Sequence, residues 1–144
     1  KEDVLVGNAS EGLDAIRAAR ADRPADEPIQ TTLRQAVAAV VTGSDVPVAT
    51  KLARGRIMRS SPALVARNLE HQAACESVIA EFVGSRLPEG SSRDLHARVV
   101  AATVIAATRA AMEHWLATDG RDDFAVLLDE SLATLDRGAA GLQA

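Results

Sequence analysis

Apolar residues recur in this chain every three or four positions, and they nowhere alternate every second position over a useful length. The last segment is the clearest case, with apolar stripe residues Phe124, Leu127, Leu128, Leu132 and Leu135. This spacing places the apolar side chains on one face of an α-helix. The sequence therefore predicts an all-α protein without a sheet, and its 144 residues fit one domain over residues 1–144.

Breakers and capping residues divide the chain into six predicted helices. Ser61-Pro62 starts the fourth helix, and Ser91 with Asp94 three residues later reads as a capping box for the fifth. Gly120 fits the position just after the end of that helix. The six predicted helices span residues 2–21, 26–42, 45–59, 61–87, 91–117 and 122–137.

Charge and cysteine content exclude several classes of function. The formal net charge is −4, so the chain gains nothing from the counterion release that drives non-specific DNA binding. Cys75 is the one cysteine, which rules out an intramolecular disulfide and fits a reducing, cytoplasmic setting. The longest apolar stretch is interrupted by Thr103, Thr108 and Arg109, so we expect no membrane span.

The fourth predicted helix carries polar residues within its apolar face. Asn68, Gln72 and Glu76 fall there beside Cys75. Buried amides and carboxylates are costly without partners, which leaves two interpretations. They are either satisfied by hydrogen bonds within the core, or they line a mostly apolar cavity and bind the polar group of a ligand. On such a face, Cys75 is expected to be an inert small hydrophobe rather than a redox sensor.

No set of residues predicts enzymatic chemistry, a metal or another cofactor. The histidines are His71, His96 and His114, and none has a glutamate three residues before it, as the ligand pairs of di-iron bundles do. No phosphate-binding glycine loop occurs either. We therefore expect a protein that is not an enzyme.

The third predicted helix carries the one dense basic run, Lys51–Arg59, and Pro47 and Gly55 interrupt its pattern. Such a run is usually a solvated face. The functional alternative is that it binds an anionic group of a ligand or faces another domain.

The last two predicted helices have the features of an interface. The fifth is apolar on most sides from Val99 to Met112, and the sixth has the single stripe described above. These two helices could form a four-helix bundle with the same pair of a second subunit. Ordinary packing within one chain explains the same pattern.

Two parts of the sequence resemble the TetR family of transcriptional regulators. The opening Lys1-Glu2-Asp3-Val4-Leu5 is similar to the end of the motif that closes the family's DNA-binding helix-turn-helix. The Ser61-Pro62-Ala63-Leu64 start and the ending Trp115-Leu116 with Gly120–Phe124 resemble the C-terminal domain of actinobacterial members. The resemblance implies that residues 1–22 are a linking helix, and that DNA binding belongs to an N-terminal domain missing from this chain.

The resemblance also implies a homodimer that binds a small apolar or amphipathic molecule among its middle helices, which relieves DNA binding by the parent protein. The implied ligand residues are Leu52, Met58, Asn68, Gln72, Cys75, Glu76, Ile79 and Thr103. The implied dimer face is Ala101, Val104, Ile105, Thr108, Met112, Phe124, Leu127, Leu128 and Leu132. The alternative is a structural helical module that binds another protein and no ligand.

Overall fold

The computed structural model describes residues 14, 17–18, 24, 27–42 and 45–137, and five helices run through them. The helices are α2 (Ile29–Thr42), α3 (Val48–Met58), α4 (Pro62–Arg86), α5 (Arg93–Ala117) and α6 (Phe124–Arg137). These ranges contain no strand, which confirms the all-α prediction for the described residues. The first predicted helix, residues 2–21, lies almost entirely outside them, so the count of six helices stays a prediction.

Two helix ends follow from the local sequence as expected. Ser61 caps α4, because its Oγ accepts a hydrogen bond from the backbone N–H of Leu64 at 3.3 Å. Beside the start of α3, α5 stops at Ala117, and the backbone N–H of Gly120 donates to the Trp115 carbonyl at 2.9 Å. Gly120 has a φ of +66°, a left-handed conformation that glycine adopts without strain.

The capping box predicted at Ser91 and Asp94 is wrong. The helix α5 begins at Arg93, and Ser92 in the N-cap position makes no capping hydrogen bond with its side chain. Instead, Arg93 Nε donates to the carbonyl oxygen of Gly84 at 2.6 Å, so a contact with α4 sets where α5 starts. Asp94 still lies in the first turn of α5, where its negative charge interacts favourably with the helix dipole.

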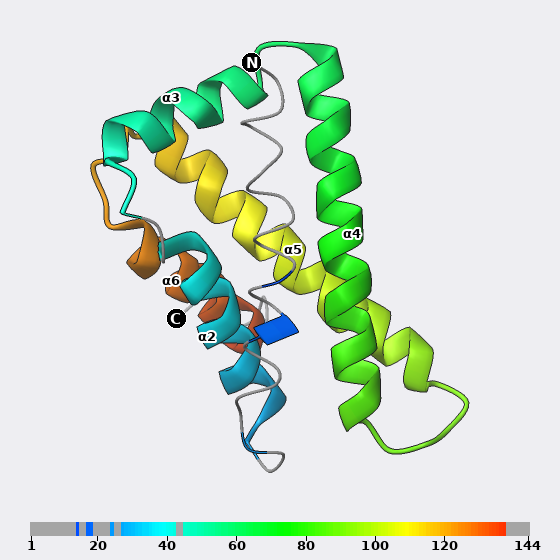
Figure 1. Cartoon of the computed structure of the whole chain (residues 1–144). Coiled ribbons are helices and arrows are strands. Elements are labelled where there is room, and N and C mark those ends of the chain that lie inside the picture. Colours follow the sequence, from blue (N-terminus) through cyan, green and yellow to red (C-terminus); the bar gives the residue numbers. More distant parts are fainter. Residues whose placement is uncertain (1–13, 15–16, 19–23, 25–26, 43–44, 138–144) are drawn as a thin grey trace.

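Helix α5 is central, because it packs against α4 on one side and against α6 on the other, while α2 covers α6. Helix α3 contacts both α4 and α5, and Figure 1 shows these three as the sides of a triangle. The core joins residues of α2, α4, α5 and α6: Leu33, Val37, Cys75, Ile79, Phe82, Val83, Ala97, Ala101, Val104, Ala107, Leu128 and Leu132. Small residues let α4 and α5 approach closely, since a Cβ on Gly84 would lie 3.7 Å from that of Ala97.

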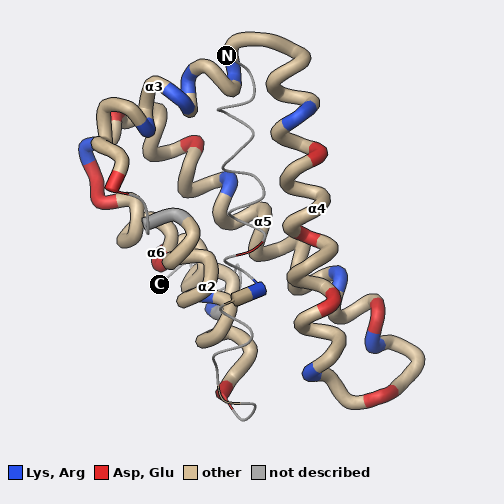
Figure 2. The backbone as a smooth tube through the Cα atoms, viewed as in Figure 1, with Lys and Arg blue, Asp and Glu red and all other residues tan. Residues whose placement is uncertain are grey.

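The middle of α5 carries no charged residue between Arg98 and Arg109, and this stretch of the helix is tan in Figure 2. By length and composition alone, α5 is long and apolar enough to cross a membrane. From the sequence we expected no such segment, because Thr103, Thr108 and Arg109 interrupt the apolar stretch. Its contacts with α4 and α6 provide a second reason for that composition. A helix at the centre of a folded domain is apolar on most of its sides.

Candidate functional site

One side of α4 is packed in its second half and open in its first half. Val65, Leu69, Gln72, Glu76 and Val83 share this side, because they follow each other at helical spacing. Val83 is 1% exposed, whereas Val65 is 40% and Leu69 is 53% exposed. The same apolar side is therefore covered by α5 near its end and uncovered near its start, where α4 leaves α3.

The structure separates the predicted ligand residues into two groups on α4. Asn68, Gln72 and Glu76 are half-buried at or beside the open side. Cys75 and Ile79 are buried within the core cluster, and Ile79 is only 1% exposed. The first group can contact a ligand bound to α4, whereas the second group packs in the core, with Ile79 farther along the same side of the helix.

The remaining predicted ligand residues lie on α3 and α5. Met58 is half-buried at the end of α3. Leu52 is buried near Trp115, since a Cβ on Gly120 would lie 3.2 Å from Leu52 Cδ1 and 3.3 Å from Trp115 Cζ2.

Thr103 is not brought to this group. It lies about 200° around α5 from the fully buried Ala101, and its hydroxyl donates to the Val99 carbonyl within the same helix. Sequence periodicity placed Thr103 on an apolar helix but did not reveal which side of that helix is buried.

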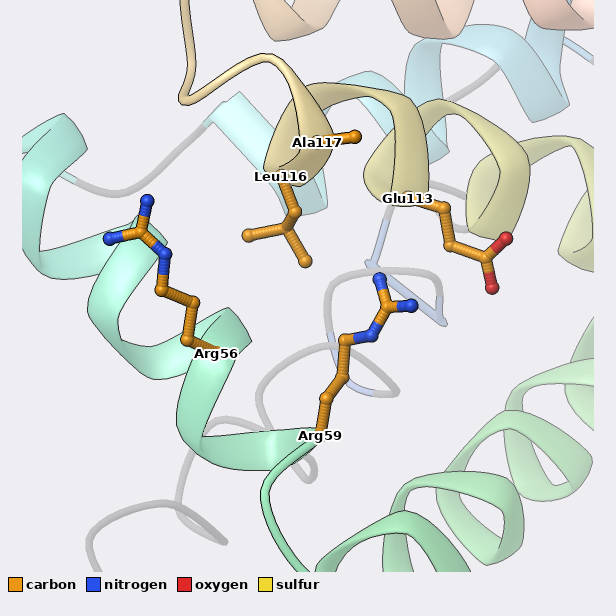
Figure 3. Close-up of a pocket in the computed structure, with 5 residues that line it drawn as sticks. All are labelled: Arg56, Arg59, Glu113, Leu116 and Ala117. Carbon is orange, nitrogen blue, oxygen red and sulfur yellow. The ribbon is translucent and has the colours of Figure 1, made fainter.

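A cleft of about 530 Å³ lies between α3 and α5, lined by Arg56, Arg59, Glu113, Leu116 and Ala117 (Figure 3). Gly55 leaves room for the Leu116 side chain against α3, because a Cβ there would lie 2.6 Å from Leu116 Cδ2. The basic run of the sequence supplies the two arginines. The α5 residues of this cleft were not anticipated, although Gly55 inside a helix was the signal of a close helix contact.

The charges around this cleft are only partly paired. Arg56 donates from Nη2 to Asp119 Oδ1 at 2.5 Å, which ties α3 to the turn between α5 and α6. The side chains of Arg59 and Glu113 make no ion pair or hydrogen bond with any described residue, although Figure 3 shows Arg59 extending from the end of α3 toward Glu113 on α5. A cation and an anion are thus presented across one opening.

His71 and Cys75 lie one turn apart on α4, with 3.6 Å between Cys75 Sγ and His71 Nε2. Burial lowers the pKa of His71 and raises the pKa of the Cys75 thiol. Both groups are therefore neutral near pH 7, and the pair lacks the thiolate that a nucleophile or a redox sensor needs. Within the described residues no group of three metal-ligating side chains occurs.

Four residues of the implied dimer face belong to the core of the chain itself. Ala101, Val104, Leu128 and Leu132 are 0 to 6% exposed, so they hold α5, α4 and α6 together. The other five are half-buried: Ile105, Thr108, Met112, Phe124 and Leu127. Phe124 packs edge-on against Trp115, with 5.7 Å between the ring centres.

The outer surface of α5 and α6 is instead formed by other apolar and small residues. Leu95, Val99 and Val126 are 54 to 62% exposed, and Ala102, Ala106 and Ala110 lie on the same exposed side of α5 as Val99. A smaller cleft of about 300 Å³ adjoins it, lined by Ala110, Ala111, His114, Leu127, Glu130, Ser131 and Thr134. Any partner of these two helices would meet this surface.

Comparison with known proteins gives one match that covers most of the chain. The family model described as the MftR C-terminal domain, a TetR-type C-terminal domain, matches residues 14–140. The comparison with curated proteins gives no match.

Proposed function

The chain belongs to the MftR C-terminal domain family of TetR-type regulators, and on this premise we propose that it binds a small effector and forms the dimer of a transcriptional regulator. In this proposal the parent protein is cytoplasmic, its DNA-binding domain lies outside this chain, and effector binding relieves DNA binding. The chain itself is acidic, with a net charge of −4, and contributes no affinity for DNA. It is a regulatory domain and not an enzyme.

The open side of α4 is the observation that carries this proposal. Leucine and valine side chains there are 40 to 53% exposed, and half-buried Asn68, Gln72 and Glu76 lie among them. Binding sites for small molecules combine an apolar wall with a few polar groups that orient the ligand. An apolar or amphipathic effector would cover Val65 and Leu69 and hydrogen-bond to Gln72.

A contact between α4 and the start of α2 offers a route for the response. Arg86, at the end of α4, donates hydrogen bonds to the carbonyl oxygens of Glu27 at 3.1 Å and Pro24 at 3.3 Å. Its guanidinium also lies 5.1 Å from the centre of the Phe82 ring, which is buried in the core. A shift of α4 on effector binding would thus move the residues that precede α2, where the chain leads toward the DNA-binding domain.

Trp115 provides a test of effector binding, because it is the only tryptophan and its ring, buried against Phe124, reports a change in the packing of α5. We expect amphipathic small molecules to change its fluorescence saturably in the wild-type chain. Gln72→Ala should abolish the change, whereas Glu70→Ala, on the exposed outer side of the same helix, should preserve it. No saturable response in the wild type to any such molecule would favour a structural module without a ligand.

The homodimer is proposed to form through the outer surface of α5 and α6. Ala106 lies on the exposed side of α5 that it shares with Val99 and Ala102. A charge introduced into an apolar interface would be buried there without a partner. Ala106→Glu should therefore convert the dimer to a monomer in sedimentation experiments. Ala73→Glu, at an exposed alanine on the outer side of α4, is the control that should remain dimeric. If Ala106→Glu stays dimeric, α5 does not form the interface.

A further inference from the structure

We propose that the cleft between α3 and α5 binds a small zwitterion, with Arg59 holding its carboxylate and Glu113 holding its ammonium group. This cleft is a second site, apart from the open side of α4, and its biological role as a regulatory site rests on the proposed function. The binding step itself can be tested in the isolated chain.

The charge pattern of the cleft favours a dipolar ligand over an ion of one sign. An anion attracted by Arg59 would also meet the carboxylate of Glu113, and a cation attracted by Glu113 would meet the guanidinium of Arg59. Only a molecule that carries both charges satisfies both side chains and avoids repulsion from either. Arg56 does not upset this balance, because its charge is already paired with Asp119.

The two side chains do not simply neutralise each other. Arg59 follows directly after α3 and Glu113 lies on α5, and these two helices are in contact where Gly55 meets Leu116. No hydrogen bond or ion pair joins the guanidinium of Arg59 to a described residue, and the same is true of the carboxylate of Glu113. An exposed pair of this kind gains only about 0–1 kcal/mol by closing, so a ligand that bridges the gap with two charge-assisted hydrogen bonds competes successfully.

The remaining walls of the cleft suit a hydrocarbon chain. Leu116 and Ala117 provide the apolar part of the lining, and Figure 3 shows Leu116 between Arg56 and Arg59. The volume of about 530 Å³ lies within the range of roughly 300–1,000 Å³ that small-molecule sites occupy. A molecule with a short aliphatic chain between or beside its two charges fits this arrangement. Since both charged side chains are exposed, we expect a dissociation constant on the order of a millimolar.

The test uses the 144-residue chain with leucine and 6-aminohexanoate as zwitterions, and hexanoate and hexylamine as ligands with one charge. Binding is measured by ligand-observed NMR titration. We expect at least one zwitterion to bind about tenfold more tightly than either singly charged molecule. Arg59→Met and Glu113→Gln should each remove this advantage, and the exchange Arg59→Glu with Glu113→Arg should restore it. Arg67→Met, at an exposed arginine of α4, is the control that leaves binding unchanged.

Three results would overturn the inference: hexanoate or hexylamine binding as tightly as the best zwitterion, no zwitterion binding up to saturating concentration, or no effect of Arg59→Met. The proposed function fails differently. If another small molecule changes Trp115 fluorescence through Gln72 while zwitterions do not bind, the effector role stands and the zwitterion site does not. If zwitterions bind through Arg59 and Glu113 but leave DNA binding by the parent protein unchanged, the site stands and the effector role fails.

Discussion

The two halves of α4 should respond very differently to the loss of an apolar side chain. Ile79 is 1% exposed in the core, and Leu69 is 53% exposed on the open side. Ile79→Ala removes three carbon atoms, worth about 2.4 kcal/mol at roughly 0.8 kcal/mol each. The cavity left in a rigid core adds to this, which gives a total of about 3–4 kcal/mol. Leu69→Ala removes a partly solvated side chain and leaves no cavity, so it should cost less than about 1 kcal/mol.

Urea denaturation of the two variants beside the wild type measures these costs, provided that the slope of the transition is unchanged. A loss of about 3–4 kcal/mol is a large fraction of the stability of about 5–15 kcal/mol expected for one domain. The reasoning is refuted if Ile79→Ala costs less than about 1 kcal/mol, or if Leu69→Ala costs as much as Ile79→Ala. The second outcome would mean that Leu69 is covered in solution by other parts of the protein.

Three further outcomes follow from the contacts within the chain. Gly55→Val should destabilise the fold by about 1–3 kcal/mol in thermal unfolding, since its side chain meets Leu116, while Gly90→Ala, with open space around it, should be neutral. Burial lowers the pKa of His71. As the pH falls below about 6.5, the imidazole therefore binds a proton more readily in the unfolded state than in the folded state. The free energy of unfolding should therefore drop more between pH 7.5 and 5.5 in the wild type than in His71→Gln; an equal drop would contradict this. Since burial raises the pKa of Cys75, iodoacetamide should alkylate the native thiol at least about tenfold more slowly than the urea-unfolded thiol at pH 8, and equal rates would show that the thiol is accessible.

The sequence predicted those parts of the fold that depend on local chemistry. The cap at Ser61 and the end of α5 involve only neighbouring residues, and the cap is confirmed; after the C-cap Thr118, Asp119 takes the first left-handed position with a φ of +53° and Gly120 the second. The capping box at Ser91 is wrong, because the start of α5 depends on the contact of Arg93 with Gly84 on another helix. A pattern of residues within one segment carries no information about such a contact.

Periodicity also predicted which residues share a face, but not which neighbour covers that face. Helix α5 is apolar on most sides, so its sequence fitted both a subunit interface and an internal core. The structure places Ala101 and Val104 in the core and leaves Val99 and Ala106 outside. The implied dimer face therefore moves to the outer side of the same helices as a proposal.

The candidate site was predicted in part for the same reason. Asn68 and Gln72 were recognisable as polar residues on an apolar face of one helix, and they lie half-buried at or beside the open side of α4. The facing of Arg59 and Glu113 depends on how α3 crosses α5. How two helices cross depends on tertiary contacts. Gly55, a glycine inside a helix, was the one sequence feature that indicated a close contact there.

Native mass spectrometry of the purified chain shows in one experiment whether it forms a dimer and whether that dimer binds a small molecule. The monomer has a mass of 15.1 kDa. We expect a species of twice that mass, which acquires the mass of one small molecule per subunit when an effector is added and lacks that adduct in Gln72→Ala. A species of 15.1 kDa at micromolar concentration that takes up no added small molecule would contradict both the dimer and the effector site.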